Sequence, residues 1–390
     1  MLLVIETHPI QYHAPVWKYL NQTLGIPVTV IYGSDFSVVG YQDKEFGTSF
    51  AWDVDLLGGY NSIFLSKSAN GGAKSDAEVT TRGLSEAIAQ VDPDVILSVG
   101  YSPKFHSEAV KIAKKFTRPM IFRAETNDQA RTRGPIKRIL RDVFLKRFYR
   151  NFQALLHVGK RSQEHYHRLG FQTDPRMFSP YCVDPTPFQT GDSFRSTVRE
   201  DVRKEIGAHP NQIVVMFCGK LSLRKAPGLI LEAISRIDSS KKSKFFVLLV
   251  GDGELRQKLE SDANQFHISL KHVGFKKQHE LSRYYHASDL LVLPSIWGET
   301  WGLVVNEALH HGLPAVVSSS VGCAEDLIFP GQTGEIFKNG DVRSLAECLD
   351  SALKLAGDPE IRNKCRNKVS DFSVEKASNG IAYAIKTVLA

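Results

Sequence analysis

The sequence predicts an α/β protein with two doubly wound parallel-sheet (Rossmann-like) domains that face each other across a cleft. Short apolar, β-branched runs alternate with longer helical patterns, and this alternation restarts once near the middle of the chain. Apolar runs of this kind between helices are typical of parallel strands that are covered on both faces. A length of 390 residues also exceeds what one hydrophobic core usually supports, so two domains are expected.

The expected strands form two series. They are residues 2–6, 28–32, 94–99, 119–123 and 154–158, then 213–218, 245–250, 270–273, 290–293 and 315–318. A segment rich in Pro, Asp, Ser and Thr separates them and places the linker near 180–190. We therefore expect an N-terminal domain (1–185), a C-terminal domain (186–372) and a last helix (373–390), opened by Ser373 as N-cap, that packs back on the first domain.

The composition is that of a globular protein, with 42% hydrophobic and 23% charged residues. No apolar run approaches the roughly 18 residues of a spanning helix. The five cysteines are scattered and form no Cys-x-x-Cys, which predicts reduced thiols rather than disulfides or a zinc site. The first residues lack the basic segment of a signal peptide, so we expect a cytoplasmic protein.

The positive charge is unevenly distributed. Residues 1–180 contribute +6 of the net +7, and residues 131–150 alone hold eight basic residues and one acidic residue. Apolar residues recur there at helical spacing, which predicts an amphipathic helix with a cationic face. That helix either packs against the sheet or lies on an anionic membrane at its inner face, where it would bring the cleft to a lipid-linked acceptor. No motif accompanies the charge that would indicate nucleic acid.

The segment 290–307 carries the strongest functional signal. It reads as a buried strand, a Gly-rich loop and a helix that begins near Leu303. Backbone amides at such a helix start predict a diphosphate site at Gly302 and Leu303. Glu299 in the loop and Glu307 in the helix are expected to take hydroxyl pairs from a sugar and a ribose; the alternative is two ordinary surface glutamates.

Basic residues follow the strand that ends near Gly219. Lys220, Arg224 and Lys225 lie in the loop before the next helix. An ammonium group there neutralises charge on a departing diphosphate if it points into the cleft. The alternative is a solvated basic turn.

Two further strands end in glycine turns. Gly251 and Gly253 let the backbone approach a ligand, but a structural turn is favoured because Arg256 replaces the third glycine of a dinucleotide fingerprint. The turn at Gly274-Phe275 is able to present backbone groups to a nucleobase.

In this order, the features resemble the family-four retaining glycosyltransferases (group 1 type) of the GT-B fold. The resemblance covers nearly the whole chain and is densest from 213 to 340. The family hallmark is two glutamates separated by seven residues around an aromatic-Gly-Leu, and Glu299 and Glu307 match it, with Trp301 as the aromatic residue. The resemblance implies that Glu299 holds the donor sugar and Glu307 the ribose of the nucleotide.

The same resemblance assigns the remaining donor residues. Lys225 matches the family's diphosphate lysine, and Lys220 stands where many members have arginine, without the bidentate fork. We thus expect Glu299, Lys225 and Lys220 to act in catalysis. The expected donor-binding set is Glu307, Gly302, Leu303, Trp301, Gly219, Gly251, Gly253 and Phe275.

The acceptor half carries weaker signals. The family's N-terminal Gly-rich loop is replaced by residues 7–15, and its N-domain histidine is not evident. The candidate acceptor-side residues are His8, His13, His106, Arg123 and Glu125. For Arg123 and Glu125 a buried ion pair is the alternative. Asp53 and Asp55 form an Asp-x-Asp pair in an early loop-like region, which we interpret as solvated carboxylates, so no metal is predicted.

These observations predict a retaining, metal-independent hexosyltransferase. It moves a sugar from a nucleotide sugar to the hydroxyl of a carbohydrate or lipid-linked acceptor, in cell-envelope, exopolysaccharide or glycolipid biosynthesis, and needs no cofactor. The alternatives are a sugar-nucleotide epimerase on the same fold and a non-catalytic, glycosyltransferase-like binding protein. An NAD enzyme is disfavoured by the incomplete glycine fingerprint.

Overall fold

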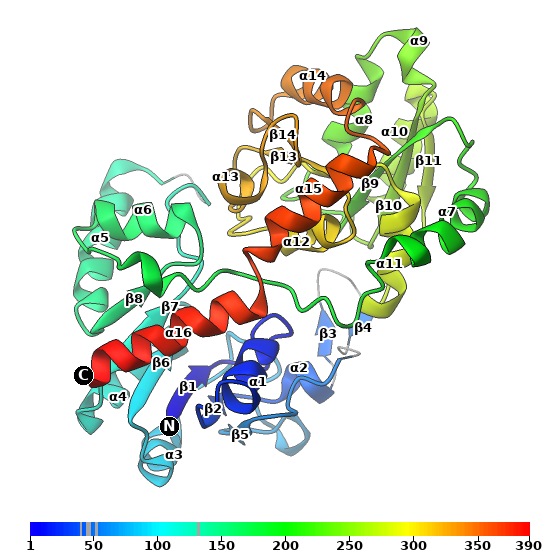
Figure 1. Cartoon of the computed structure of the whole chain (residues 1–390). Coiled ribbons are helices and arrows are strands. Elements are labelled where there is room, and N and C mark those ends of the chain that lie inside the picture. Colours follow the sequence, from blue (N-terminus) through cyan, green and yellow to red (C-terminus); the bar gives the residue numbers. More distant parts are fainter. Residues whose placement is uncertain (40, 44–47, 51–53, 131–132) are drawn as a thin grey trace.

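The computed structural model describes residues 1–39, 41–43, 48–50, 54–130 and 133–390. Within these ranges the chain forms two lobes, each built on a six-stranded parallel sheet (Figure 1). Asp53 of the Asp-x-Asp pair and residues 131–132 of the basic segment lie outside the described residues.

The N-terminal sheet has the order β5-β2-β1-β6-β7-β8. Its strands are β1 (Leu2–Glu6), β2 (Val28–Tyr32), β5 (Asn61–Phe64), β6 (Val95–Ser98), β7 (Met120–Arg123) and β8 (Ala154–Leu156). Its helices are α1 (Ala14–Gln22), α2 (Phe36–Val39), α3 (Leu84–Val91), α4 (Lys104–Ala113), α5 (Pro135–Tyr149) and α6 (Lys160–Arg168). A short antiparallel pair, β3 (Tyr41–Asp43) and β4 (Thr48–Phe50), lies outside this sheet.

The C-terminal sheet has the order β11-β10-β9-β12-β13-β14. Its strands are β9 (Ile213–Cys218), β10 (Phe245–Val250), β11 (Ser269–His272), β12 (Leu290–Leu293), β13 (Ala315–Ser318) and β14 (Gly334–Phe337). Its helices are α7 (Asp192–Ile206), α8 (Gly228–Ser235), α9 (Ser239–Lys242), α10 (Arg256–Phe266), α11 (Gln278–Ala287), α12 (Leu303–His310), α13 (Ala324–Leu327), α14 (Val342–Ala352) and α15 (Pro359–Ser370).

Both faces of the N-terminal sheet are buried, as the uninterrupted apolar strands predict. Along β1, Leu2 and Val4 belong to one hydrophobic cluster, whereas Leu3 and Ile5 belong to another on the opposite face. Successive side chains of a strand point to opposite faces, so a strand between two helical layers must be apolar at every position. The predicted fold class, two doubly wound sheets, is therefore confirmed.

The last helix, α16 (Val374–Leu389), runs from the C-terminal lobe along the N-terminal lobe (Figure 1). Ser373 Oγ caps it by accepting a hydrogen bond from the Lys376 amide at 3.2 Å. Ala377, Ile381 and Ala384 belong to the same hydrophobic cluster as β1 and α1. The chain therefore passes between the lobes twice, once in the linker and once at the start of α16.

Candidate active site

A hydrogen-bonded ion pair at the carboxyl ends of the C-terminal strands joins Lys225 and Glu299. Lys225 lies in the loop after β9 and Glu299 in the loop after β12, which are neighbouring strands. The Lys225 ammonium donates a hydrogen bond to Glu299 Oε2, and Ser295 Oγ donates to the same oxygen at 2.9 Å. Sheet order thus brings together two residues that the sequence analysis placed in catalysis.

Glu299 is buried but charged. Burial by itself would raise the pKa of its carboxyl group, but the Lys225 ammonium and the Ser295 hydroxyl hold that pKa below the usual 4.5. Arg224 Nη1 lies 3.9 Å from the same Oε2 atom. The site therefore presents a fixed carboxylate beside two cations, which suits a sugar with hydroxyl groups and a diphosphate.

Glu307 lies in a different environment, on α12. Its Oε2 accepts a hydrogen bond from the Tyr285 hydroxyl at 2.6 Å, and its Oε1 accepts one from the Tyr12 hydroxyl of the other lobe at 3.4 Å. Burial raises the pKa of Glu307 to about 7, against the lowering effect of these two hydroxyls. The Glu307 carboxyl group therefore titrates near neutral pH, whereas the Glu299 carboxyl group is ionised there.

The start of α12 has the geometry of an anion site. Gly302 precedes the helix with φ 105°, a left-handed conformation that favours glycine. A Cβ atom at Gly302 would also lie 3.0 Å from the side chains of Leu293 and Val321. The first amides of a helix generally lack an intrahelical acceptor, which makes such a helix start suited to an anion. In α12 the Val305 amide donates to the Gly302 carbonyl at 2.9 Å, and the amides of Leu303 and Val304 precede it at the start of the helix.

Trp301 was expected among the donor-binding residues, but its indole ring is buried against Tyr181 and Phe372. The ring is 3% exposed and donates from Nε1 to Asn306 Oδ1 at 2.9 Å. A Cβ atom added to Gly159 would lie 2.5 Å from the edge of this ring. Trp301 thus joins the two lobes and the linker, because a large apolar ring is more stable in that contact than in a polar cleft.

The three other glycines of the expected donor set lie where two loops meet. A Cβ atom at Gly251 would be 2.0 Å from the carbonyl oxygen of Gly219, and one at Gly253 would be 2.6 Å from that of Leu221. The Gly219 amide also donates to Val250. Gly251 and Gly253 are therefore required by backbone packing, in agreement with the favoured structural-turn interpretation. Phe275 is partly exposed at its turn.

A cavity of about 500 Å³ lies on the N-terminal side of the cleft. Its walls include Tyr101 from the loop after β6, Glu125 from the loop after β7, Arg141 of α5, and Gly298 and Thr300 from the loop after β12. Two hydrogen bonds join the lobes beside this cavity. Asn127 Nδ2 donates to the Thr300 carbonyl at 3.1 Å, and the Gly298 amide donates to the Ala130 carbonyl at 2.6 Å. The cavity is therefore lined by both lobes and lies next to the loop that carries Glu299.

Of the expected acceptor-side residues, Glu125 lines this cavity. Its Oε2 accepts a hydrogen bond from the Tyr181 hydroxyl at 2.8 Å. Arg123 was also expected to contact an acceptor, but it is 1% exposed and donates to Ser179 and to the Pro180 carbonyl. Arg123 therefore fixes the start of the linker and forms neither the acceptor contact nor the ion pair that the sequence suggested.

The three candidate histidines lie below the surface of the N-terminal lobe. His13 is held between Glu6 Oε1 at 2.9 Å and the Tyr181 hydroxyl at 3.1 Å. His8 bonds Thr7 and packs against Phe36, and burial lowers the pKa values of both His8 and His106 to about 4. His106 lies against Gly100, with its ring 3.4 Å from the Cβ position there. His8 and His106 are therefore neutral at physiological pH, and His13 is held in place by Glu6 and Tyr181.

The sequence analysis missed the residues that hold the two glutamates. Tyr12, Tyr285 and Ser295 contact Glu307 or Glu299, and Tyr181 connects Glu125 with His13. Ser295 stands four residues before Glu299 in the motif itself and was a detectable signal. The tyrosines come from distant segments, so their contacts follow only from the packing of the lobes.

The outer face of α5 is unlike that of the other helices. Its apolar residues are largely exposed: Ile136 by 73%, Ile139 by 62%, Leu140 by 65%, Val143 by 62% and Phe144 by 46%. The buried residues of α5 are Leu145, Phe148 and Tyr149. These five residues of the predicted apolar face thus remain outside the core.

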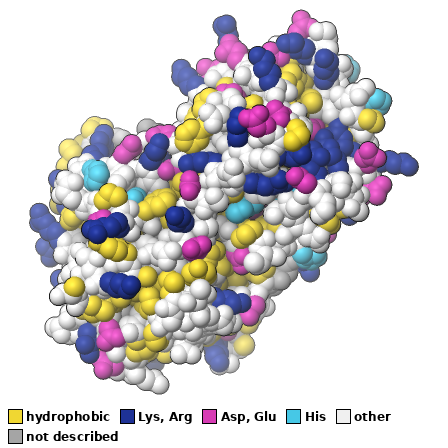
Figure 2. Space-filling view, viewed as in Figure 1, with side chains coloured by type: hydrophobic (Ala, Val, Ile, Leu, Met, Phe, Trp, Pro, Cys, Tyr) yellow, Lys and Arg dark blue, Asp and Glu magenta, His cyan; other side chains and the backbone are white. Residues whose placement is uncertain are grey.

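Charge is also distributed unevenly on the surface. On the face shown in Figure 2, basic side chains gather on the upper lobe near α7 and α15. Several of these are held in ion pairs, such as Arg366 with Asp192 and Arg199 with Asp289. Among the described residues, no cluster of three or more His, Cys, Asp or Glu side chains could hold a metal ion, and no helix is long and apolar enough to cross a membrane.

Comparison with known proteins agrees with this geometry. The family model of glycosyl transferases group 1 matches residues 198–371. A crystal structure of Anabaena HepE in complex with UDP superimposes with a TM-score of 0.71 at 17% identity, covering 99% of both chains.

Two curated relatives are also similar. An uncharacterized glycosyltransferase of Methanocaldococcus jannaschii is 29% identical over 145 residues, which cover 37% of this chain and only 36% of that protein. The alpha-1,4-N-acetyl-D-galactosaminyltransferase of Campylobacter jejuni that acts on a diNAcBac-PP-undecaprenol glycan is 25% identical, covering 75% of this chain and 74% of that protein. The chain thus has the GT-B fold, and its residues 198–371 match the group 1 glycosyl transferases.

Proposed function

We propose that this protein is a retaining glycosyltransferase that moves a sugar from a nucleotide sugar to an acceptor hydroxyl. The observation that carries this proposal is the ion pair between the half-buried Lys225 and the buried Glu299, just before α12 and within the segment that matches the group 1 glycosyl transferases. A carboxylate suited to sugar hydroxyls, an ammonium group suited to phosphate and the first amides of α12 lie close together there. The UDP complex of HepE supports a nucleotide-sugar donor.

Each donor residue has a separate role in this proposal. Glu299 accepts hydrogen bonds from sugar hydroxyls, and Glu307, in its charged form, accepts them from the ribose. The amides at Gly302 and Leu303 bind the diphosphate, and Phe275 lies beside the base. Lys225, with Lys220, neutralises the charge that develops on the leaving diphosphate, so we propose that these cations do the work that a metal ion does in other transferases.

We propose front-face attack for the chemical step. The acceptor oxygen bonds to the anomeric carbon on the face from which the diphosphate leaves, so the configuration is retained. The bond from that carbon to the phosphate oxygen breaks, and the leaving oxygen takes the acceptor proton. Glu299 is already paired with Lys225 and Ser295, which suits a residue that positions the sugar better than a nucleophile.

We further propose that α5 rests on an anionic membrane at its cytoplasmic face. An exposed apolar stripe beside basic residues is the arrangement by which a helix lies in a lipid interface. The PP-undecaprenol glycan of the Campylobacter jejuni relative supports a lipid-linked acceptor. Such an acceptor places the enzyme in cell-envelope, exopolysaccharide or glycolipid synthesis.

A transfer assay tests the proposed function. The full chain is incubated with radiolabelled UDP, GDP, ADP or CMP sugars and with bacterial lipid extract, and lipid-extractable label is counted. We expect label from one donor, its loss in Glu299→Gln, and wild-type activity in the control Glu347→Gln, which changes an exposed glutamate of α14. An epimerase would instead yield a changed nucleotide sugar without lipid, and an idle binding protein would yield neither product.

A further inference from the structure

Tyr181, at the start of the linker, contacts both lobes. Its ring packs against Trp301 of the C-terminal lobe, with the ring centroids 6.1 Å apart, and its carbonyl accepts a hydrogen bond from Asn306 Nδ2 of α12 at 3.4 Å. In the N-terminal lobe, the Arg123 guanidinium lies 5.1 Å from the centroid of the same ring. The position of Tyr181 is therefore set by both lobes at once.

The Tyr181 hydroxyl belongs to a chain of hydrogen bonds that begins in the core of the N-terminal lobe. Glu6, the last residue of β1, is fully buried, and its Oε1 lies 2.9 Å from His13 Nδ1. His13 Nε2 lies 3.1 Å from the Tyr181 hydroxyl, which donates to Glu125 Oε2 at 2.8 Å. A hydroxyl has one proton, and this one is donated to Glu125, so His13 Nε2 must donate to the Tyr181 oxygen. The hydrogen bonds of His13 and Tyr181 thus both run towards Glu125.

Glu125 ends this chain at the 500 Å³ cavity. It is half-buried, and its second carboxylate oxygen, Oε1, has no hydrogen-bond partner among the described residues. A carboxylate oxygen accepts hydrogen bonds, so a donor group of a ligand suits it. A hydroxyl fits better than an amine, because Arg133 and Arg141 line the same cavity and would repel a further cation. Since Gly298 and Thr300 line it too, a hydroxyl bound to Glu125 lies next to the loop after β12.

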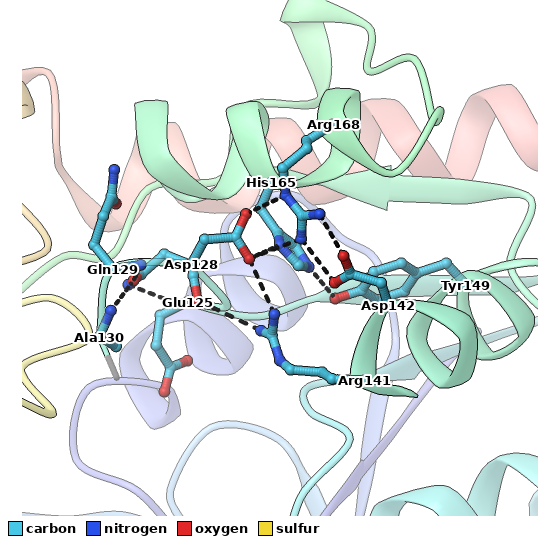
Figure 3. A network of polar contacts seen from close by, with 10 residues as sticks. Glu125, Asp128, Gln129, Ala130, Arg141, Asp142, Tyr149, His165 and Arg168 are labelled. Carbon is cyan, nitrogen blue, oxygen red and sulfur yellow. Dashed lines mark hydrogen bonds and ion pairs between the residues drawn. The ribbon is translucent and has the colours of Figure 1, made fainter. Parts of the chain in front are cut away.

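The loop that carries Glu125 is held separately by Asp128. Three side chains donate hydrogen bonds to the Asp128 carboxylate, namely Arg141 at 3.0 Å, His165 at 2.9 Å and Arg168 at 2.6 and 2.9 Å (Figure 3). The Glu125 carboxylate points away from this network (Figure 3). Asp128 therefore fixes the loop, whereas the hydrogen bond from Tyr181 orients the Glu125 side chain.

We propose that Tyr181 is a positioning residue for the acceptor. Its hydroxyl orients Glu125 so that Oε1 accepts a hydrogen bond from a hydroxyl of the acceptor, and its ring and carbonyl keep this contact aligned with Trp301 and α12. The ligand class that fits is an uncharged sugar end group with at least two hydroxyls, one that reacts and one that binds Glu125. This inference rests on the proposed function and adds acceptor recognition to the donor site.

Tyr181→Phe tests this role, because it removes the hydroxyl and keeps the ring between Arg123 and Trp301. In the transfer assay with bacterial lipid extract, we expect the half-saturating amount of extract to rise about tenfold, since a hydrogen bond to a charged group is lost. The half-saturating concentration of nucleotide sugar, and the rate of its hydrolysis without extract, should stay unchanged. The matched control is Tyr60→Phe, which removes a hydrogen-bonded hydroxyl outside the cavity lining and should behave as the wild type does.

A double variant shows whether Tyr181 acts through Glu125. Glu125→Gln should raise the half-saturating amount of extract at least as much as Tyr181→Phe does. The double variant Tyr181→Phe/Glu125→Gln should lose no more than Glu125→Gln alone, because both changes remove the same contact. Losses that multiply in the double variant, or the same loss in Tyr60→Phe, would overturn the positioning role.

Nucleotide-sugar binding separates this inference from the proposed function. If Tyr181→Phe binds the nucleotide sugar and reaches half-saturation at the same amount of extract as the wild type, the role of Tyr181 alone is refuted. A wild-type chain that binds no nucleotide sugar refutes the proposed function, and the present inference with it.

Discussion

Lys225 and Glu299 are 74 residues apart in the chain, yet they form a buried ion pair because β9 and β12 are adjacent in the sheet. The pair places a cation and a carboxylate at one point of the cleft wall. Its stability depends on both partners, since either charge left alone in a buried site is costly. This relationship connects the fold with the proposed chemistry.

Lys225→Ala should therefore lower the free energy of unfolding by about 3 kcal/mol, because Glu299 is left buried without its cation. Urea unfolding at pH 7.5 measures this loss. The double variant Lys225→Ala/Glu299→Gln should recover a large part of it, because the uncompensated charge is removed. Additive losses in the two single variants would show that the pair does not stabilise the fold.

Glu307 gives a pH dependence of stability with a definite sign. Its pKa is about 7 in the folded protein against 4.5 when unperturbed, so the folded state binds the extra proton between these values. The contribution of Glu307 to stability is thus largest below pH 4.5, falls as the pH rises towards 7, and has been lost above pH 7, by about 3 kcal/mol at most.

Thermal unfolding of wild type and Glu307→Gln between pH 5 and 8.5 checks this. The difference in melting temperature between the two proteins should grow in favour of Glu307→Gln from pH 5 to about 7 and level off above pH 7. In Tyr285→Phe the midpoint of this change should move to higher pH, because the hydroxyl that lowers the pKa of Glu307 is removed. A difference that stays constant with pH would contradict the assigned environment.

The exposed apolar stripe of α5 predicts that membrane binding can be abolished by substitutions that leave the stability of the fold nearly unchanged. Ile139→Glu and Leu140→Glu should abolish co-sedimentation with phosphatidylglycerol vesicles and change the melting temperature little, because both side chains are exposed. Leu389→Glu, at an exposed apolar site on α16, is the control that should bind vesicles as the wild type does. Unchanged sedimentation of both α5 variants would refute the membrane role.

Gly159 tests the contact between the lobes. A Cβ atom there would lie 2.5 Å from the Trp301 ring and 2.7 Å from Asp326 Oδ2, so Gly159→Ala should destabilise the protein by about 1–3 kcal/mol. Gly134→Ala is the control, since no atom lies within 4 Å of its Cβ position. Calorimetric unfolding of both variants measures the difference, and equal melting temperatures would contradict this packing.

The strands of both sheet centres were predictable because they are buried on two faces. The edge strands β5 and β14 were not, since Asn61–Phe64 is half-buried and Gly334–Phe337 contains glycine and glutamate, so neither shows a continuous apolar run. Similarly, the motif at 299–307 predicted the loop and the helix that begins at Leu303, because its residues are close in sequence. The roles of Arg123 and Trp301 were not predictable, because each depends on the linker and on the other lobe.

The most direct test of the central claim is a thermal-shift titration with UDP, GDP, ADP and CMP sugars on wild type, Glu299→Gln and Glu347→Gln. One nucleotide sugar should raise the melting temperature of wild type and Glu347→Gln in a saturable manner, and by more than its free nucleotide does. In Glu299→Gln the increment due to the sugar should disappear. If none of these donors stabilises the wild-type protein, or if Glu299→Gln responds as the wild type does, the proposed donor site is contradicted.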